Sequence, residues 1–170
     1  RRLRSLYPAD QGQQLEKYAQ ILEREGSSSA AQFYQAIAEF YPGSHLKRSA
    51  QIKLAQFHQK SEEWEEAIAV LRQISPSDLS TLVSLGKIYL YGLYDLDTAE
   101  RIFQQLSGQQ LVYNLQQQVN LLIAECYILR GRSVAAQSVL GPVVDKYGDF
   151  QIRAQKLIGD SYLFNAEFDK

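Results

Sequence analysis

The sequence is poor in the residues and runs that mark a disulfide-bonded or membrane-spanning protein. It has no methionine, four prolines and a single cysteine, Cys126, among 170 residues. One cysteine cannot form an intramolecular disulfide, so cysteine usage leaves the compartment open. No run of about 18 apolar residues occurs, and we therefore expect no transmembrane segment. Because even position 1 lacks methionine, we expect this chain to be a segment of a longer protein.

The chain also lacks an excess of positive or negative charge. The chain has 18 basic and 19 acidic residues, a formal net charge of −1, and both signs are spread along its length. Nucleic-acid binding needs a concentrated basic surface, so this distribution argues against it. The one basic cluster is Arg1, Arg2 and Arg4. We interpret residues 1–10 as a linker or N-terminal extension with a solvated basic end. The hydrophobic fraction of 45% is normal for a folded chain.

A short pattern recurs along the whole chain. In it a large residue precedes a small one, and an apolar or aromatic residue or histidine follows three positions later. The small residues are Ala19, Ala55, Gly86, Ala124 and Gly159. Between them, an alanine is followed four residues later by a large residue at Ala30/Tyr34, Ala67/Leu71, Ala99/Phe103 and Ala136/Leu140. Spacings of three and four place each set on one helix face, and small residues let two helix backbones approach. The pattern predicts a repeat protein built from antiparallel helix pairs.

The chain length fits about five two-helix repeats of roughly 34 residues. We predict an all-α fold with about nine helices in one domain, 1–170, of about 4.5 repeats. The predicted repeats are 11–43, 44–76, 77–109, 110–148 and an incomplete 149–170. The predicted helices are 11–25, 27–41, 45–60, 61–75, 77–91, 97–108, 110–130, 133–147 and 149–164.

Serine and aspartate residues mark several predicted helix starts. We predict N-caps at Ser77, Asp97 and Ser133, and at the serine run 27–29, because these side chains accept hydrogen bonds from free amides of the first turn. Pro142 lies inside the eighth predicted helix, where we expect a bend.

The repeat pattern resembles the tetratricopeptide repeat (TPR) family over nearly all of the chain, and that resemblance implies a right-handed α-solenoid. The junction Phe40-Tyr41-Pro42-Gly43-Ser44, with Ala50 and Leu54-Ala55 after it, is similar to one in bacterial envelope repeat proteins. These include BamD-like outer-membrane assembly lipoproteins and YbgF-like partners of the Tol–Pal system. A second copy, with Gly148 where proline is usual, begins at Lys146-Tyr147 and continues to Tyr162.

This resemblance implies a scaffold without catalysis or cofactor, located in the periplasm or cell envelope. A cytoplasmic location stays open, because the same junction also occurs in cytoplasmic repeat proteins. The sequence departs from the family pattern near Leu85, where the repeat carries an extra residue before Ala99. Other repeat proteins of this kind hold a C-terminal carboxylate with lysine and asparagine on their first helices. The corresponding positions here are Gln56, Lys87 and Glu125, so we do not favour that mode.

Residue types that could carry catalysis do not form a recognisable site. His45 and His58 are thirteen positions apart, which is not a helical metal-binding spacing, and we expect structural roles for both. Cys126 lies in the middle of a predicted helix and fits a buried free thiol. The glutamates at 62, 63, 65 and 66 fit a solvated helix start.

The candidate partner-binding surface lies on the first helix of each repeat and at the tyrosine-rich turn 89–94. In stacked helix pairs, first helices line a groove that suits a peptide or an amphipathic helix. Tyrosine offers a large contact area with a polar tip. The alternative is that this turn packs back on the neighbouring repeat. The candidate residues are Ile52, Gln56, Val83, Lys87, Leu90, Tyr91, Tyr94, Leu121, Glu125, Ile128 and Asp160.

Three functions remain open from the sequence. The first is a non-catalytic adapter that holds another protein in this groove, in a bacterial envelope assembly. The second is a structural or self-assembling segment that uses the apolar face Ile158–Phe164. The third is the docking arm of an enzyme whose catalytic domain lies elsewhere.

Overall fold

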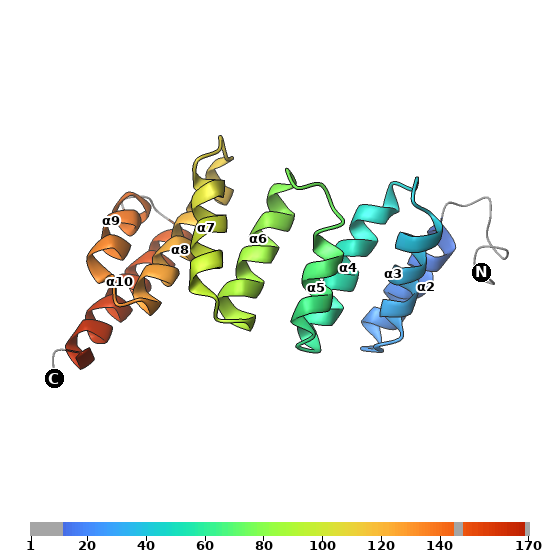
Figure 1. Cartoon of the computed structure of the whole chain (residues 1–170), viewed down its shortest axis with the longest axis horizontal. Coiled ribbons are helices and arrows are strands. Elements are labelled where there is room, and N and C mark those ends of the chain that lie inside the picture. Colours follow the sequence, from blue (N-terminus) through green and yellow to red (C-terminus); the bar gives the residue numbers. More distant parts are fainter. Residues whose placement is uncertain (1–11, 145–147, 169–170) are drawn as a thin grey trace. The chain divides into compact units, whose positions relative to one another are not determined.

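The computed structural model describes residues 12–144 and 148–168, and these ranges contain nine α-helices and one π-helix (Figure 1). The chain divides into two compact units, Arg1–Thr81 and Leu82–Lys170. The helices are α2 (Gln13–Arg24), α3 (Ala30–Phe40), α4 (Leu46–Lys60), α5 (Trp64–Leu71), α6 (Leu79–Lys87), the π-helix η1 (Ile88–Gly92), α7 (Leu96–Ser107), α8 (Tyr113–Leu129), α9 (Ser133–Val144) and α10 (Asp149–Phe168).

The first unit is built from two helix pairs, α2/α3 and α4/α5, in which consecutive helices run in opposite directions (Figure 1). Each helix packs on the next, and α2 also packs on α4, which is the first helix of the second pair. Leu15, Ala19, Ala30 and Ile37 lie in one core with almost no exposed surface. This is the stacking that the alternation of small and large residues predicts.

The second unit repeats this arrangement with η1, α7, α8, α9 and α10. Helix α8 packs on α7, α9 and α10, so it is the centre of the unit. Its core contains Leu121, Ala124, Ala136, Leu140 and other apolar side chains of α8, α9 and α10. Among the helices of the two described ranges, none combines the length and apolar character that a membrane crossing requires.

The predicted second-helix pattern is confirmed throughout. All four alanines and the four large residues that follow them are buried in the fold. These residues are Ala30, Tyr34, Ala67, Leu71, Ala99, Phe103, Ala136 and Leu140. Alanine lets the backbone of the neighbouring helix approach, and the large side chain four residues later fills the space beside it.

The small residues of the first helices are buried at four of the five positions. The exception is Gly159 on α10, which is exposed and has no heavy atom within 4 Å of the point that a Cβ atom would occupy. In the earlier repeats, by contrast, a second helix follows the first and covers the small residue. Within the described residues no helix follows α10, and Gly159 therefore lacks the neighbour that its position in the repeat normally meets.

The extra residue near Leu85 is accommodated by a change of helix type. After Lys87 the chain leaves α-helical geometry and forms η1, in which the Leu93 amide donates to the Ile88 carbonyl at 3.0 Å. A π-helix spans five residues per hydrogen bond and so takes up one residue without breaking the helix. Tyr94 then adopts a left-handed backbone with φ of 55° before α7 begins.

Two of the predicted N-caps are wrong by one or two residues. The cap of α7 is Asp95 rather than Asp97: its Oδ1 accepts a hydrogen bond from the amide of Thr98 at 3.0 Å. Before α6, Asp78 rather than Ser77 accepts from the amide three residues later, at 2.9 Å. In both cases the carboxylate accepts a hydrogen bond from the free amide three residues later. Residue type alone does not show which of two nearby side chains has this spacing.

The predicted helix start at Ser61 and the other serine caps have different outcomes. Ser61 ends α4, and Glu63 precedes α5 without a side-chain cap. Ser133 is buried, and its hydroxyl donates to the Ser161 carbonyl of α10 at 3.0 Å. At the serine run, Ser29 holds the N-cap position of α3 as predicted, but its side chain makes no capping hydrogen bond. Ser133, predicted to cap α9, is the first residue of that helix, and its hydroxyl links α9 to α10.

Some predictions concern residues outside the described ranges. The linker 1–10 with its arginines, and Lys146 and Tyr147 of the second junction, are among them. Within those ranges, Pro142 lies inside α9, which ends two residues later, at Val144. Helix α10 runs to Phe168, four residues beyond the predicted end of 164.

Candidate partner-binding site

The candidate residues are divided between the two units. Ile52 and Gln56 lie on α4 in the first unit, where Ile52 is half-buried and Gln56 is exposed. The other nine candidates lie in the second unit. Only the second unit therefore brings several of the candidates together on neighbouring helices.

The best-defined element of this site is a contact between Tyr91 and Glu125. Tyr91 lies on η1 and is 49% exposed, and its hydroxyl donates a hydrogen bond to Glu125 Oε2 on α8. Partial burial raises the pKa of the Tyr91 phenol, and the hydrogen bond and negative charge of Glu125 raise it further. The phenol therefore stays protonated at neutral pH and acts as a donor. This contact joins the first helices of two successive pairs.

Glu125 also lines a hollow of about 240 Å³ with side chains of α10. The hollow carries two carboxylates, Glu125 and Asp160, and two cations, Arg153 and Lys156, with Leu157 as its apolar member. Within the described residues the structure shows no ion pair for Arg153 or Lys156, and both side chains are exposed. Such a surface has charges of both signs available to a partner.

Sequence reasoning identified Glu125 and Asp160 but missed Arg153, Lys156 and Leu157. A signal for them was present in the spacing. Positions 153, 156, 157 and 160 recur every three or four residues and therefore share one face of α10 with Asp160. Arg153 and Lys156 are also next in sequence to Ala154 and Leu157, which belong to the repeat pattern.

Four other candidates are buried. Leu90 and Leu121 have no exposed surface, and Val83 and Ile128 are only 6% and 7% exposed. These side chains offer almost no atoms to a partner and instead support the surface from beneath. Their apolar character, which suggested binding anchors, reflects packing.

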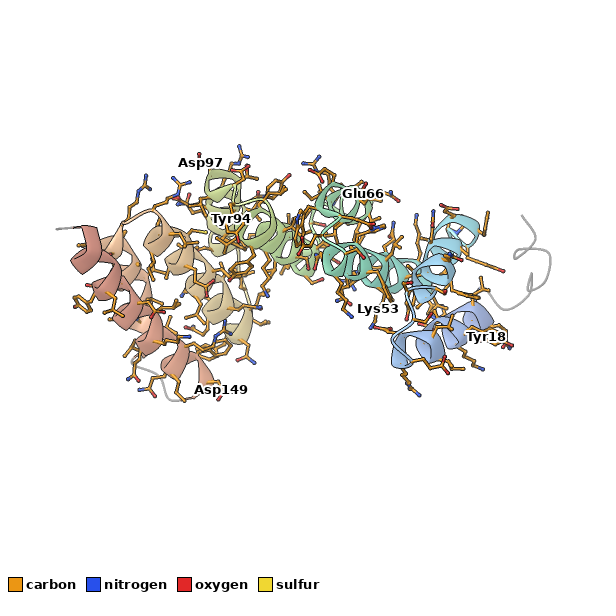
Figure 2. The ribbon with its side chains drawn as sticks, turned by 90° about the horizontal axis from the view of Figure 1, so that it is seen from below. Tyr18, Lys53, Glu66, Tyr94, Asp97 and Asp149 are labelled. Carbon is orange, nitrogen blue, oxygen red and sulfur yellow. The ribbon has the colours of Figure 1, made fainter. Side chains whose placement is uncertain are left out.

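The two remaining candidates lie at either end of η1. Lys87 precedes η1 and is half-buried, whereas Tyr94 follows it and is 76% exposed. Figure 2 labels Tyr94 at this turn, together with Asp97 in the first turn of α7. Of the tyrosine-rich turn, Tyr91 and Tyr94 thus face solvent and Leu90 is packed inside. Packing on the fold therefore accounts for Leu90, and partner binding by Tyr91 and Tyr94 stays a prediction.

Cys126 and His58 are the reactive side chains that lie within helices of the described ranges. Cys126 is a buried free thiol, and burial, assisted by the charges of Glu100 and Glu125, raises its pKa to about 12. It is protonated at neutral pH and hence a poor nucleophile. His58 Nδ1 lies 2.6 Å from Glu63 Oε2. The described ranges contain no group of three or more histidine, cysteine, aspartate and glutamate residues that could hold a metal ion.

Comparison with known proteins identifies the fold. No protein-family model and no curated protein matches this sequence. Among solved structures, the chain is similar to a protein from Podosopora anserina described as a kinesin light chain with nearly identical TPR-like repeats. The TM-score is 0.71 at 16% identity, and a glutamine-to-methionine variant of that protein gives 0.72 at 15%. Each comparison covers 91% of this chain and 86% of the other.

An identity of 16% carries information about the fold alone. The chain has an all-α, TPR-like repeat architecture, as the repeat pattern predicts. Folds of this kind present protein-interaction surfaces in general. The function of this particular chain depends on the residues at its own surface, because one fold serves many functions.

Proposed function

We propose that this chain is a non-catalytic adapter that binds a segment of another protein across Tyr91, Glu125 and the face of α10 that carries Arg153, Lys156 and Asp160. The observation that carries the proposal is the convergence of three first helices, η1, α8 and α10, on one surface. There an exposed aromatic side chain lies beside a hollow of mixed charge.

The chemistry of this surface favours a peptide or helix that carries both positive and negative side chains. A cationic side chain can approach Glu125 and Asp160, and an anionic one can approach Arg153 and Lys156. Tyr91 supplies apolar contact area with few rotatable bonds, which limits the entropy lost on binding. Complementary charges would contribute mainly to specificity and association rate.

We further propose that this adapter works in a bacterial envelope assembly. The support for this is the resemblance of the junction Phe40–Ser44 to envelope repeat proteins. A cytoplasmic assembly is the alternative, and the experiment must sample both compartments.

The test is affinity capture from separate cytosolic and detergent-solubilised envelope extracts, followed by titration calorimetry with the purified partner. Tyr91→Asp should remove capture of the specific partner, because it takes away the aromatic contact and places a second carboxylate beside Glu125. Tyr18→Asp is the matched control: Tyr18 has the same exposed fraction, 49%, and lies on α2 in the first unit.

The two variants must retain wild-type helicity in circular dichroism. The proposal fails if partner binding survives Tyr91→Asp, or if both variants reduce it equally. Recovery of the partner from the cytosolic extract alone would keep the adapter function and reject the envelope location. Leu90→Asp is unsuitable as a test, because that side chain is fully buried and its substitution would unfold the unit.

A second candidate function is self-assembly through α10. Leu157 and Ile158 pack against the core, but Tyr162 and Leu163 are 60% and 68% exposed, and the side chain of Phe164 lies outside the described residues. Ile152, 67% exposed, shares a face with Leu163, because eleven residues are about three helical turns. Light scattering over a wide concentration range tests whether the chain self-assembles. A constant monomer mass rejects it, and oligomers that Leu163→Glu disperses support it.

A further inference from the structure

The first unit carries a hollow of its own, formed by α3, α4 and α5. Its volume is about 330 Å³, at the lower end of the range for ligand pockets. Leu54 of α4 and Val70 of α5 supply its apolar floor, and Ala38 of α3 and Ala69 of α5 line it with small side chains. The size and lining suit one or two aliphatic side chains better than a cofactor.

The carboxylates that line this hollow are Glu39 and Glu66, and His58, whose Nδ1 lies 2.6 Å from Glu63 Oε2, lines it as well. Glu39 on α3 and Glu66 on α5 line it from opposite helices, and both are exposed. Glu39 accepts a hydrogen bond from the neutral amide of Gln35 at 2.8 Å, and within the described residues no ion pair is formed by Glu66. Glu66 lies in the first turn of α5 and is labelled in Figure 2. The two carboxylates are thus available to cationic side chains of a partner.

A second hollow, on the other side of Gln51 and Gln73, is lined by basic side chains. These two residues line both the first hollow and the second one of about 370 Å³, where His45, Lys47 and Arg48 are found. Arg48 is already paired with Asp78 at 2.6 Å. A segment that lies over both hollows therefore meets carboxylates at one end and cations, chiefly Lys47, at the other.

From these observations we infer that the first unit binds an amphipathic helix of another protein along α3, α4 and α5. The helix inserts an aliphatic side chain over Leu54 and Val70 and places lysine or arginine within reach of Glu39 and Glu66. Its opposite end is acidic and faces Lys47. An amphipathic helix is the favoured occupant because an apolar slot with a charged rim matches side chains spaced by three and four residues. This inference does not depend on the site at Tyr91.

The experiment is a selection from a displayed library of helical peptides of about 16 residues, long enough for about four turns, against the full chain. The expected clones combine an aliphatic anchor with basic residues one turn away at one end and acidic residues at the other. Dissociation constants of the best clones are then measured by fluorescence anisotropy for the wild type and for paired variants.

Glu66→Lys and Glu65→Lys make the matched pair. Both glutamates lie in the first turn of α5 and both substitutions change the charge equally, but only Glu66 lines the hollow. We expect Glu66→Lys to weaken binding by about tenfold or more and Glu65→Lys to change it by less than about threefold. Raising the salt concentration should weaken wild-type binding and narrow the difference between the variants.

Ala69→Trp tests the apolar slot separately. Ala69 is exposed, so a larger side chain there fills the hollow without replacing core atoms. We expect this variant to keep its helicity and to lose peptide binding even at high salt. Tyr91→Asp should leave peptide binding unchanged. The inference is overturned if no binder is selected, if the clones show no basic end, or if Glu65→Lys and Glu66→Lys weaken binding equally.

Discussion

Gly86 and Gly159 occupy the same repeat position, but the structure predicts opposite effects for their replacement by alanine. At Gly86, a Cβ atom would lie 2.3 Å from Cε1 and 2.6 Å from Cζ of Phe103. Ordinary contacts begin near 3.4 Å, so the ring would have to move by about 1 Å. Phe103 has no exposed surface, and the surrounding core leaves no direction free for that movement.

The magnitude follows from two opposing terms. Alanine in a helix is favoured over glycine by about 1 kcal/mol, whereas overpacking a well-packed core costs about 1–3 kcal/mol. For Gly86→Ala the clash is severe enough to place the cost at the upper end, and the net loss is about 2 kcal/mol. For Gly159→Ala no heavy atom lies within 4 Å of the new Cβ, and a gain of up to about 1 kcal/mol remains.

Urea denaturation followed by circular dichroism at 222 nm measures this difference. With slopes of about 1–3 kcal/mol per molar urea, the two midpoints should separate by about 1 M or more. In a Phe103→Leu background, Gly86→Ala should cost less, because the smaller side chain removes the contacting ring atoms. Higher stability for Gly86→Ala than for the wild type, or equal effects of the two substitutions, would refute the packing argument.

Three further substitutions or measurements test local features. Asp78→Asn should lower the stability of the first unit by about 1 kcal/mol at neutral pH, because Asp78 pairs with Arg48. That hydrogen bond, despite partial burial, holds the pKa of Asp78 below its ordinary value, so its stabilisation is complete above about pH 4 and lost on acidification. Urea midpoints between pH 7 and pH 2 should therefore fall less steeply in Asp78→Asn, and parallel curves would contradict this. Asp95→Ala removes the α7 cap on the Thr98 amide and should cost about 1 kcal/mol in thermal unfolding, and an unchanged unfolding temperature would contradict this role. Cys126 should react with a disulfide reagent only on unfolding, because it is buried with its pKa raised to about 12, and rapid native labelling would contradict that placement.

The all-α repeat architecture and much of the core could be predicted from the sequence, whereas the π-helix η1 could not. The alanine positions Ala67 and Ala99, and the large residues that follow them, are buried as predicted. This works because a helical repeat buries its residues at short, regular spacings along the chain. Neighbours three and four positions apart then determine which face is covered, and no distant contact has to be known.

Helix starts were less predictable, because capping depends on backbone geometry within one or two residues. The cap of α7 is Asp95 and not Asp97, and before α6 it is Asp78 rather than Ser77. Both outcomes depend on where each side chain can reach in three dimensions. A pattern of residue types cannot distinguish two acceptors that lie two positions apart.

The tertiary structure alone decided which candidate binding residues are exposed. Leu90 and Tyr91 are adjacent in the sequence, but the π-helical turn buries Leu90 and directs Tyr91 to Glu125, 34 residues later. Arg153 and Lys156 line a common hollow with Glu125 only because α10 packs on α8. The sequence by itself determined the repeat architecture, since that depends on local periodicity. The binding surfaces depend on contacts between repeats, and those exist only once the helices are packed.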